Sequence, residues 1–244
     1  MLNFIISALK IIIMLGFLVF IHEGGHFLVA KLFKIKVNEF AIGFGPRIFT
    51  KEKGETIYAL RLIPLGGFVN LEGEEVPSNE EGSFSKASIP KKIAIVAAGG
   101  LVNIIFGIIV YFILITAISN LQSALINTKE YIFEVLKSLA QLFTGKLHTE
   151  QLTGIVGISN IVVNTSGIRE YIYIVSAISL SLGITNLLPF PPLDGGKILL
   201  YIIEAIRRKK LKEETELKIQ SWGFSLLIAL SIYVTYKDIL KLFW

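Results

Sequence analysis

The chain has 244 residues, 53% of them hydrophobic without counting glycine, and its mean hydropathy is +0.67. Soluble domains are roughly 45–50% apolar even when glycine is counted, so this composition favours a membrane protein. The chain has no cysteine, which excludes disulfides and thiolate metal sites. The net charge is +5, and the charged residues lie between apolar runs and do not form a basic arm, which argues against nucleic-acid binding.

Four apolar runs follow one another along the chain. A spanning helix needs about 20 mostly apolar residues, and the first two runs reach this length while the last two are shorter. We therefore predict a single domain over residues 1–244 that is an α-helical polytopic membrane protein. Its four transmembrane helices are predicted at residues 11–33, 93–118, 171–188 and 222–240.

The connection between the first two runs has its own structure. Residues 37–71 mix β-forming residues with turn signals, and Arg47–Thr50 and Thr56–Leu62 are predicted as short strands. A turn at Glu52–Gly54 would join them. We expect a small membrane-associated β-sheet here, followed by an exposed acidic segment over residues 72–90.

The connection before the third run contains an amphipathic pattern. Apolar residues recur at helical spacing from Tyr131 to Phe143, with Glu134, Lys137 and Gln141 between them. This pattern predicts an amphipathic helix over residues 129–143, lying on the outer membrane surface.

The basic residues between the runs predict the orientation in the membrane. Nine Lys and Arg lie within residues 34–92, four within 119–170 and seven within 189–221, including the block from Arg207 to Lys210. By the positive-inside rule, the first and third connections are cytoplasmic and both termini are extracytoplasmic.

An H-E-x-x-H motif, from His22 to His26, lies inside the first apolar run. Residues four apart are about 40° apart around a helix, so both imidazoles can reach one zinc ion beside Glu23. Such a short pattern can arise by chance, but each ionisable group costs at least about 2.5–3.5 kcal/mol at the bilayer centre. Three within five residues therefore indicate a metal site. Gly24 and Gly25 would let another backbone or a substrate approach closely.

Two histidines leave zinc without a third protein ligand. The candidate is Asp194, which lies between a proline-rich break and Gly195-Gly196. Asp194 could instead cap a helix that starts at Gly195, since Asp is favoured at that position. The incomplete zinc site upstream favours ligation. The remaining histidine, His148, is predicted to be an exposed loop residue.

The motifs HEGGHF at 22–27 and NLLPFPPLDGG at 186–196 resemble those of the site-2 protease class of intramembrane metalloproteases, specifically the bacterial RseP-like branch. IPLGGFV at 63–69, AAGGLVN at 97–103 and LTGIVGI at 152–158 extend the resemblance over nearly the whole chain. It implies a Zn²⁺-dependent endopeptidase of the bacterial inner or plasma membrane, with its active site toward the cytoplasmic side. The implied substrates are transmembrane segments of single-span proteins, such as anti-sigma factors, or remnant signal peptides.

The same resemblance implies roles for individual residues. His22, His26 and Asp194 would be the zinc ligands and Glu23 the catalytic base. A strand edge would bind unwound substrate by β-augmentation. Substrate contacts are implied for Asn186, Asn103, Ile63, Gly66, Gly67 and Phe68. For Asn103, a hydrogen bond to a neighbouring helix is an equal alternative.

The chain departs from this branch in two ways. Gly100 stands where the second-span motif usually has proline, and residues 119–170 are too few to hold the PDZ domains of RseP-like relatives. A compact form lacking PDZ domains is therefore expected. The alternative function is a zinc-binding membrane transporter or sensor without proteolytic activity, which explains the ligands but gives Glu23 no role.

Overall fold

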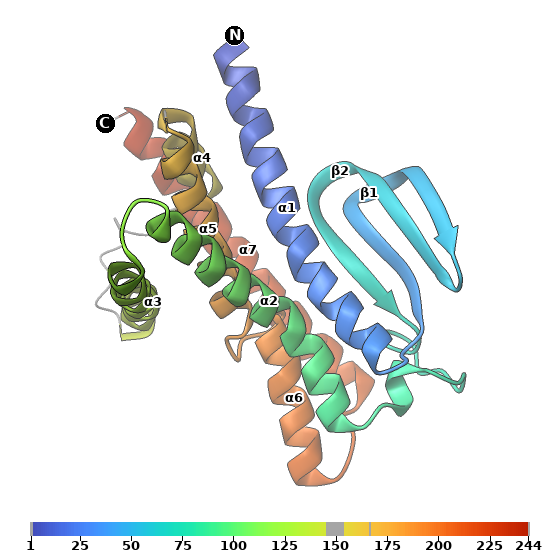
Figure 1. Cartoon of the computed structure of the whole chain (residues 1–244). Helices are drawn as coiled ribbons and strands as arrows, with labels where there is room; N and C mark the ends of the chain where they lie inside the picture. The colour runs from blue at the N-terminus through green and yellow to red at the C-terminus, as the bar shows by residue number, and fades with distance from the viewer. Residues whose placement is uncertain (1, 145–153, 166, 244) are drawn as a thin grey trace. The chain divides into compact units, whose positions relative to one another are not determined.

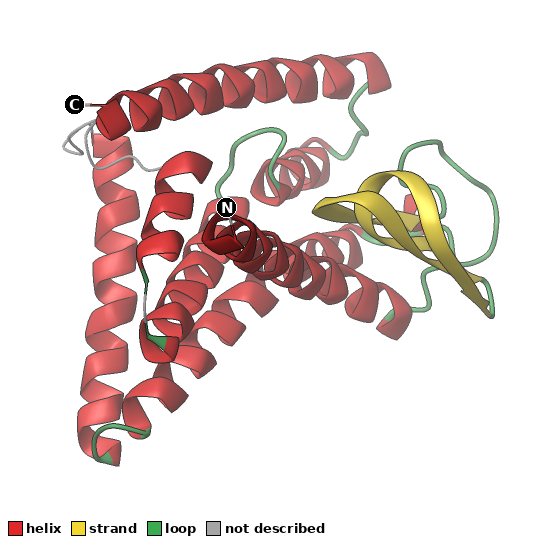
Figure 2. Cartoon of the chain, turned by 90° about the horizontal axis from the view of Figure 1, so that it is seen from above, coloured by secondary structure: helices red, strands yellow, loops and turns green. Residues whose placement is uncertain are grey.

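The structure is a computed structural model that describes residues 2–144, 154–165 and 167–243. His148 and the first two residues of the segment 152–158 lie outside these ranges. Helices dominate the described residues, and one small sheet accompanies them (Figures 1 and 2). The elements are α1 (Leu2–Leu32), β1 (Val37–Lys53), β2 (Thr56–Leu71), η1 (Phe84–Lys86), α2 (Ile89–Thr116), α3 (Leu121–Thr144), α4 (Ile155–Asn164), α5 (Ile168–Asn186), α6 (Asp194–Arg207) and α7 (Glu213–Phe243).

Four described helices are long and apolar enough to cross a membrane. The candidate spans are residues 9–32 of α1, 89–116 of α2, 168–186 of α5 and 213–241 of α7. The helix α7 begins nine residues before the predicted start, because its first turns are polar and hydropathy detects only the apolar part. The predicted amphipathic helix is also longer, since α3 begins at Leu121.

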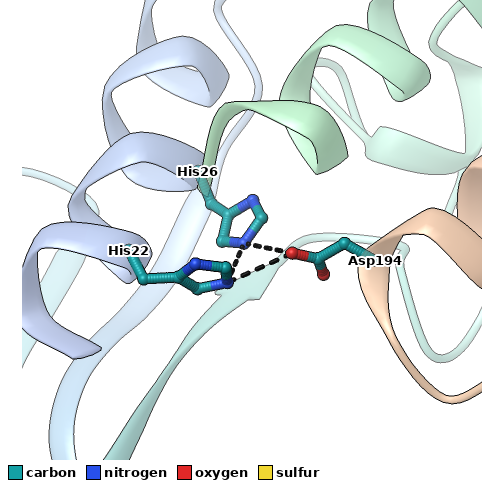
Figure 3. A group of neighbouring side chains, drawn as sticks. All are labelled: His22, His26 and Asp194. Carbon is teal, nitrogen blue, oxygen red and sulfur yellow. Dashed lines mark hydrogen bonds and ion pairs between the residues drawn. The ribbon is translucent and has the colours of Figure 1, made fainter. Parts of the chain in front are cut away.

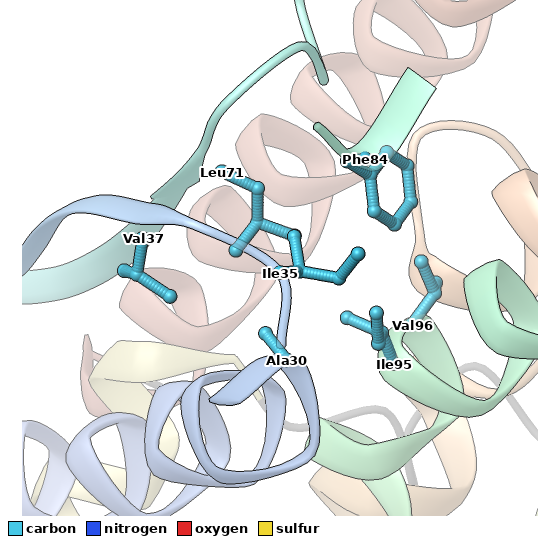
Figure 4. Close-up of a cluster of buried hydrophobic side chains, with 7 residues drawn as sticks. All are labelled: Ala30, Ile35, Val37, Leu71, Phe84, Ile95 and Val96. Carbon is cyan, nitrogen blue, oxygen red and sulfur yellow. The ribbon is translucent and has the colours of Figure 1, made fainter. Parts of the chain in front are cut away.

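The described chain divides into two compact units, and α1, α2, α5 and α7 each contribute to both. The unit built from residues 12–103 and 182–221 contains a buried apolar cluster (Figure 4). Phe84, which is 2% exposed, belongs to this cluster, so the prediction that residues 72–90 are exposed was wrong in that part. The cluster joins the end of α1, the sheet, η1 and α2 through Ala30, Ile35, Val37, Leu71, Phe84, Ile95 and Val96.

The two strands are longer than predicted, because each one bends and continues beyond the bend. Residues 39–42 of β1 pair with 67–70 on one side and with 57–60 on the other, so they lie between the two halves of β2. Gly43 and Gly45 bend β1 with φ of +88° and +82°, values that residues other than glycine adopt at a cost. The segment 67–71 pairs only with β1 among the described residues, which leaves its other edge open.

An ion-pair network holds the folded-back sheet together. Arg47 and Arg61 each donate to Glu39, with the closest nitrogen–oxygen distance 2.6 Å in both cases. Arg61 also donates to the carbonyl of Gly45, at the bend, and its guanidinium lies 5.0 Å from the centre of the Phe68 ring. Burial alone would raise the pKa of Glu39, but the hydrogen bonds from the two arginines lower it. The network therefore connects the bend of β1 to the open edge of β2.

The other unit contains residues up to Ile11, 104–181 and the chain from Trp222. Here the ring of Tyr131 on α3 stacks on that of Tyr111 on α2, 3.9 Å apart, and its hydroxyl lies 3.2 Å from Ser176 Oγ on α5. Asp238, near the end of α7, accepts hydrogen bonds from the backbone N–H groups of Gly154 and Gly157. These contacts satisfy N–H groups at the start of α4 that have no partner within the helix.

We predict that Glu39→Gln loosens the sheet, because both arginines lose their carboxylate. Proteolysis of the hairpin between residues 47 and 61 should be about tenfold faster, the factor for losing one hydrogen bond to a charged group. The control is Glu52→Gln, an exposed position on the same strand. Since the folded pKa of Glu39 is depressed, its contribution is present at neutral pH and is lost as pH falls through that lowered value. Wild type and variant should converge on acidification, and equal rates at neutral pH would contradict the role of the network.

Candidate metal centre

His22 and His26 lie on one face of α1, one turn apart, as the motif predicts. Their Nε2 atoms are 3.2 Å apart and their rings meet edge to face, with centroids 4.8 Å apart. Both side chains are nearly buried. A continuous helix is sufficient to bring these two imidazoles together, because residues i and i+4 are neighbours on its surface.

Asp194 is the first residue of α6, and Leu193 is its N-cap. The alternative in which Asp194 caps a helix starting at Gly195 is therefore not adopted. A Cβ on Gly195 would lie 2.2 Å from the carbonyl oxygen of Leu188, and one on Gly196 would lie 2.8 Å from the backbone of Phe190. The two glycines let the proline-rich segment fold tightly against the start of α6, which fixes the position of the carboxylate.

The three side chains converge on one point (Figure 3). Asp194 Oδ2 lies 3.1 Å from His22 Nε2 and 3.4 Å from His26 Nε2. Tetrahedral zinc with bonds of about 2.0–2.1 Å places its ligand atoms about 3.3 Å apart, so the spacing and the donor types fit this ion. Asp194 Oδ2 is buried and has the two imidazole nitrogens as its close polar contacts, as expected for an atom that would share one cation with them. Burial opposes ionisation of Asp194, but the two imidazoles hold its pKa well below the usual value.

Glycines allow the helices that build this centre to approach closely. A Cβ on Gly25 would lie 2.5 Å from the carbonyl oxygen of Ala98, so α1 and α2 touch through their backbones. A Cβ on Gly99 would lie 2.3 Å from His26 Nε2 and 2.8 Å from His22 Nε2. Gly24 faces open space, with nothing within 4 Å of such an atom. Gly25 and Gly99 therefore leave the room that the ligand atoms occupy.

Each imidazole has a partner for the nitrogen that faces away from Asp194. His26 Nδ1 lies 2.8 Å from the carbonyl oxygen of Ile95 on α2, which can only accept. His22 Nδ1 lies 3.5 Å from the side-chain amide of Asn103, which is fully buried on the same helix. The helix α2 thus contacts both histidines from the side opposite Asp194. It is continuous through Gly99 and Gly100, so glycine in place of the usual proline does not interrupt it.

The ligands open into a cavity of about 200 Å³ that also contains Glu23, Phe68 and Val69. Beside Phe68, the backbone of β2 lies against α1: a Cβ on Gly67 would lie 3.2 Å from Glu23 Cγ. The open edge of the sheet therefore reaches the cavity beside the carboxylate of the motif. A second cavity of about 720 Å³ shares Phe68, Val69 and the ion pair described next.

Lys197 is a site residue that the sequence reading missed. Its ammonium pairs with Glu74 at 2.8 Å, and both side chains line the cavity that holds the ligands. Burial would lower the pKa of Lys197, but the neighbouring Glu74 raises it. Lys197 follows Asp194 by three residues, so helical spacing would have placed both on one face, and only the partner 123 residues away was unpredictable.

The residues for which a substrate contact was predicted lie in different places. Phe68 lines the ligand cavity and Gly67 lies beside it. Ile63 is about half exposed, and the Phe44 ring occupies the space where a Cβ of Gly66 would lie. Asn186 is the last residue of α5 and is half-buried, and the described residues that line the ligand cavity do not include it.

Residues 10–230 match the model of a protein family that is described as peptidase family M50. The chain belongs to this family. It is similar over 95% of its length to a protein of Fusobacterium nucleatum that bears the name zinc metalloprotease, at 26% identity and with 98% of that protein covered. The zinc metalloprotease RasP of Geobacillus kaustophilus is 23% identical over 97% of this chain and 98% of its own length. A Helicobacter pylori protein with a zinc metalloprotease name is 40% identical over 42% of this chain and 31% of its own length.

Family membership makes the chain a zinc-dependent intramembrane protease of the site-2 type. The alignment with RasP has 414 positions, whereas this chain has 244 residues, so at least 170 positions of that relative have no counterpart here. This chain is thus much shorter than the aligned part of RasP.

We predict that Gly99→Ala impairs zinc binding, because the added methyl group would overlap the Nε2 atoms of both histidines. Zinc affinity should fall by at least about tenfold, the effect of disturbing groups that orient metal ligands. The matched control is Gly24→Ala, where the methyl group meets no atom. Zinc content measured by mass spectrometry after dialysis against a chelator should fall only in the first variant. Equal retention in both would contradict the geometry at Gly99.

Proposed function

We propose that this membrane protease cleaves transmembrane segments of single-span membrane proteins or remnant signal peptides, with Zn²⁺ held by His22, His26 and Asp194. The observation that carries the proposal is the convergence of three buried ligand atoms at spacings of 3.1–3.4 Å, with Glu23 in the same cavity. A structural ion pair would not need two imidazoles and a carboxylate at one point with a second carboxylate in the same cavity.

The chemistry is peptide hydrolysis. Zn²⁺, when bound, polarises a carbonyl group and makes water a nucleophile near neutral pH. Glu23 is proposed to accept a proton from the attacking water and to deliver it to the leaving amine. Its position in the motif, one residue after His22, and its place in the cavity beside the two histidines and Asp194 support this role.

The substrate must be extended at the bond that is cut, because a helix hides its carbonyls in internal hydrogen bonds. We propose that residues 67–71 receive it as an added strand. Support comes from the open edge of this segment and from Phe68 and Val69 in the ligand cavity. Asn186 stays a predicted substrate contact, at the point where α5 ends and the chain turns toward Asp194.

The four candidate spans support a polytopic protein of the bacterial inner or plasma membrane. The excess of Lys and Arg in the first and third connections supports cytoplasmic placement of both. Both termini would then be extracytoplasmic, and Asp194, just after the third span, would be near the cytoplasmic side.

For Asn103 we propose a positioning role toward His22. When Nε2 of a histidine binds a metal, Nδ1 carries the proton and donates it to an acceptor. The amide nitrogen of Asn103 lies 3.5 Å from His22 Nδ1, and rotating the amide by 180° puts its oxygen in that position. Asn103 then does for His22 what the carbonyl of Ile95 does for His26.

We predict that Glu23→Gln retains zinc and loses cleavage by at least about 10²-fold, the usual contribution of a general base. The assay uses a co-expressed single-span protein tagged on both sides of its membrane segment. Zinc content of the purified variant is measured in parallel.

The contrasting variant is His26→Ala, which should lose both zinc and cleavage. Cleavage that persists in the zinc-loaded Glu23→Gln protein would remove Glu23 from the mechanism. Zinc flux across vesicles with no cleavage product in either form would favour the transporter alternative.

We predict that Asn103→Ala lowers zinc affinity by about 10–100-fold, and that Asn103→Asp restores it because a carboxylate also accepts from Nδ1–H. Competition with a chelator measures the affinity. If Asn103 contacts substrate instead, the variant will raise KM while zinc affinity stays at the wild-type value.

A further inference from the structure

A basic cavity lies apart from the metal centre and has no role in the proposed reaction. It has a volume of about 310 Å³ and lies between the start of α2 and the end of α6. Lys92, Arg208, Lys209 and Lys210 line it, with Ser85 and a single acidic residue, Glu204. Three residues of the basic block that the sequence analysis treats as an orientation signal, Arg208 to Lys210, therefore form one wall of a concave site.

Lys92 is the unusual member of this group, because its side chain is buried. The residue is 7% exposed, and its ammonium lies 5.3 Å from the centre of the Phe84 ring and 5.5 Å from that of Tyr201. These ring faces attract a cation but accept no conventional hydrogen bond. Among the described residues, no carboxylate or carbonyl accepts one from Lys92 Nζ. The stem of Lys92 is buried while the residue lines the cavity, so an anion in the cavity would give its ammonium the hydrogen-bond acceptor that the described residues do not supply.

Glu204 does not neutralise the cavity by itself. Its Oε1 accepts a hydrogen bond of 2.7 Å from the backbone N–H of Leu211, which closes the turn after α6. Arg208 at the start of this turn has φ of +51°, and its N–H donates to the carbonyl of Ala205. The carboxylate thus fixes the segment that brings Arg208, Lys209 and Lys210 to the cavity, whose lining has four cations and one acid. Glu216 of α7 also attracts Lys92 but does not line the cavity, so the lining keeps an excess of positive charge.

The position of the cavity indicates which anion it meets. The candidate spans of α2 and α7 begin at Ile89 and Glu213, next to the two walls. Lipid headgroups lie at the ends of spans, and basic pockets there bind their phosphates.

We propose that this cavity binds the phosphate of an anionic lipid headgroup, with Lys92 as the buried contact and Arg208 and Lys210 at the rim. Free inorganic phosphate offers the same chemistry, so the test must separate the two sources. The site is independent of zinc and of proteolysis, and its failure would leave the metal centre unaffected.

The test uses the full chain in non-ionic detergent micelles. Phosphatidylglycerol or phosphatidylcholine is added, and native mass spectrometry measures the lipid retained. Phosphatidylglycerol should bind in preference, and Arg208→Gln/Lys210→Gln should weaken it about 25-fold, or about fivefold for each charge. The matched control is Lys51→Gln/Lys53→Gln, which removes two exposed charges from the hairpin of the sheet.

A second arm titrates inorganic phosphate against bound phosphatidylglycerol. Displacement at millimolar phosphate would assign the site to a soluble phosphate, and no displacement would assign it to the lipid. Equal weakening by both double variants would show that only overall charge matters and would overturn the proposal.

Lys92→Met tests the buried contact separately. In lipid-free detergent this variant should unfold at a temperature no lower than the wild type, because an uncompensated buried charge is removed. It should also lose the thermal stabilisation that phosphatidylglycerol gives the wild type. Full stabilisation by the lipid in this variant would contradict the assignment of Lys92.

Discussion

The structure depends on the close approach of three backbones around one small volume. The imidazoles come from α1 and the carboxylate from α6, and α2 passes behind both histidines. None of this is possible if side chains separate the helices, so Gly25 meets Ala98 directly and Gly99 leaves room for the Nε2 atoms. The cost of glycine in a helix, about 1 kcal/mol relative to alanine, is offset here by the metal site that the glycines make possible.

The sheet depends on the same close approach. Gly67 brings β2 against α1 at Glu23, and the segment from Gly67 to Leu71 continues along the cavity. The position of this edge is maintained from the far side, because Glu39 binds both arginines and Arg61 lies over the Phe68 ring. A binding edge has to be open and yet rigid. Here residues of the open segment line the cavity, and the ion-pair network holds the same segment from the paired strand.

The sequence predicts what is local and misses what is tertiary. The pairing of His22 with His26 follows from helical spacing, and the four candidate spans follow from hydropathy, whereas α4 was not predicted. Asp194 required chemical reasoning about an incomplete ligand set, since no local rule joins residues 168 positions apart. The contacts of Asn103 with His22 and of Lys197 with Glu74 could not be predicted, because they depend on how distant segments meet. The full length of the strands was missed for the same reason, since the bends at Gly43 and Gly45 resemble loop signals until the pairing is known.

The compact size of the chain bears on how substrates are selected. At least 170 positions of the aligned relative RasP have no counterpart here, yet the ligands, Glu23 and the strand edge are all present. The metal centre and the edge therefore do not need the additional segments to form. The cavity of about 200 Å³ is too small for a helix with its side chains, so under the proposed function it would accept a substrate only after local unwinding. Selection would then rest on how easily a transmembrane segment unwinds, a property of the substrate sequence that requires no separate recognition domain.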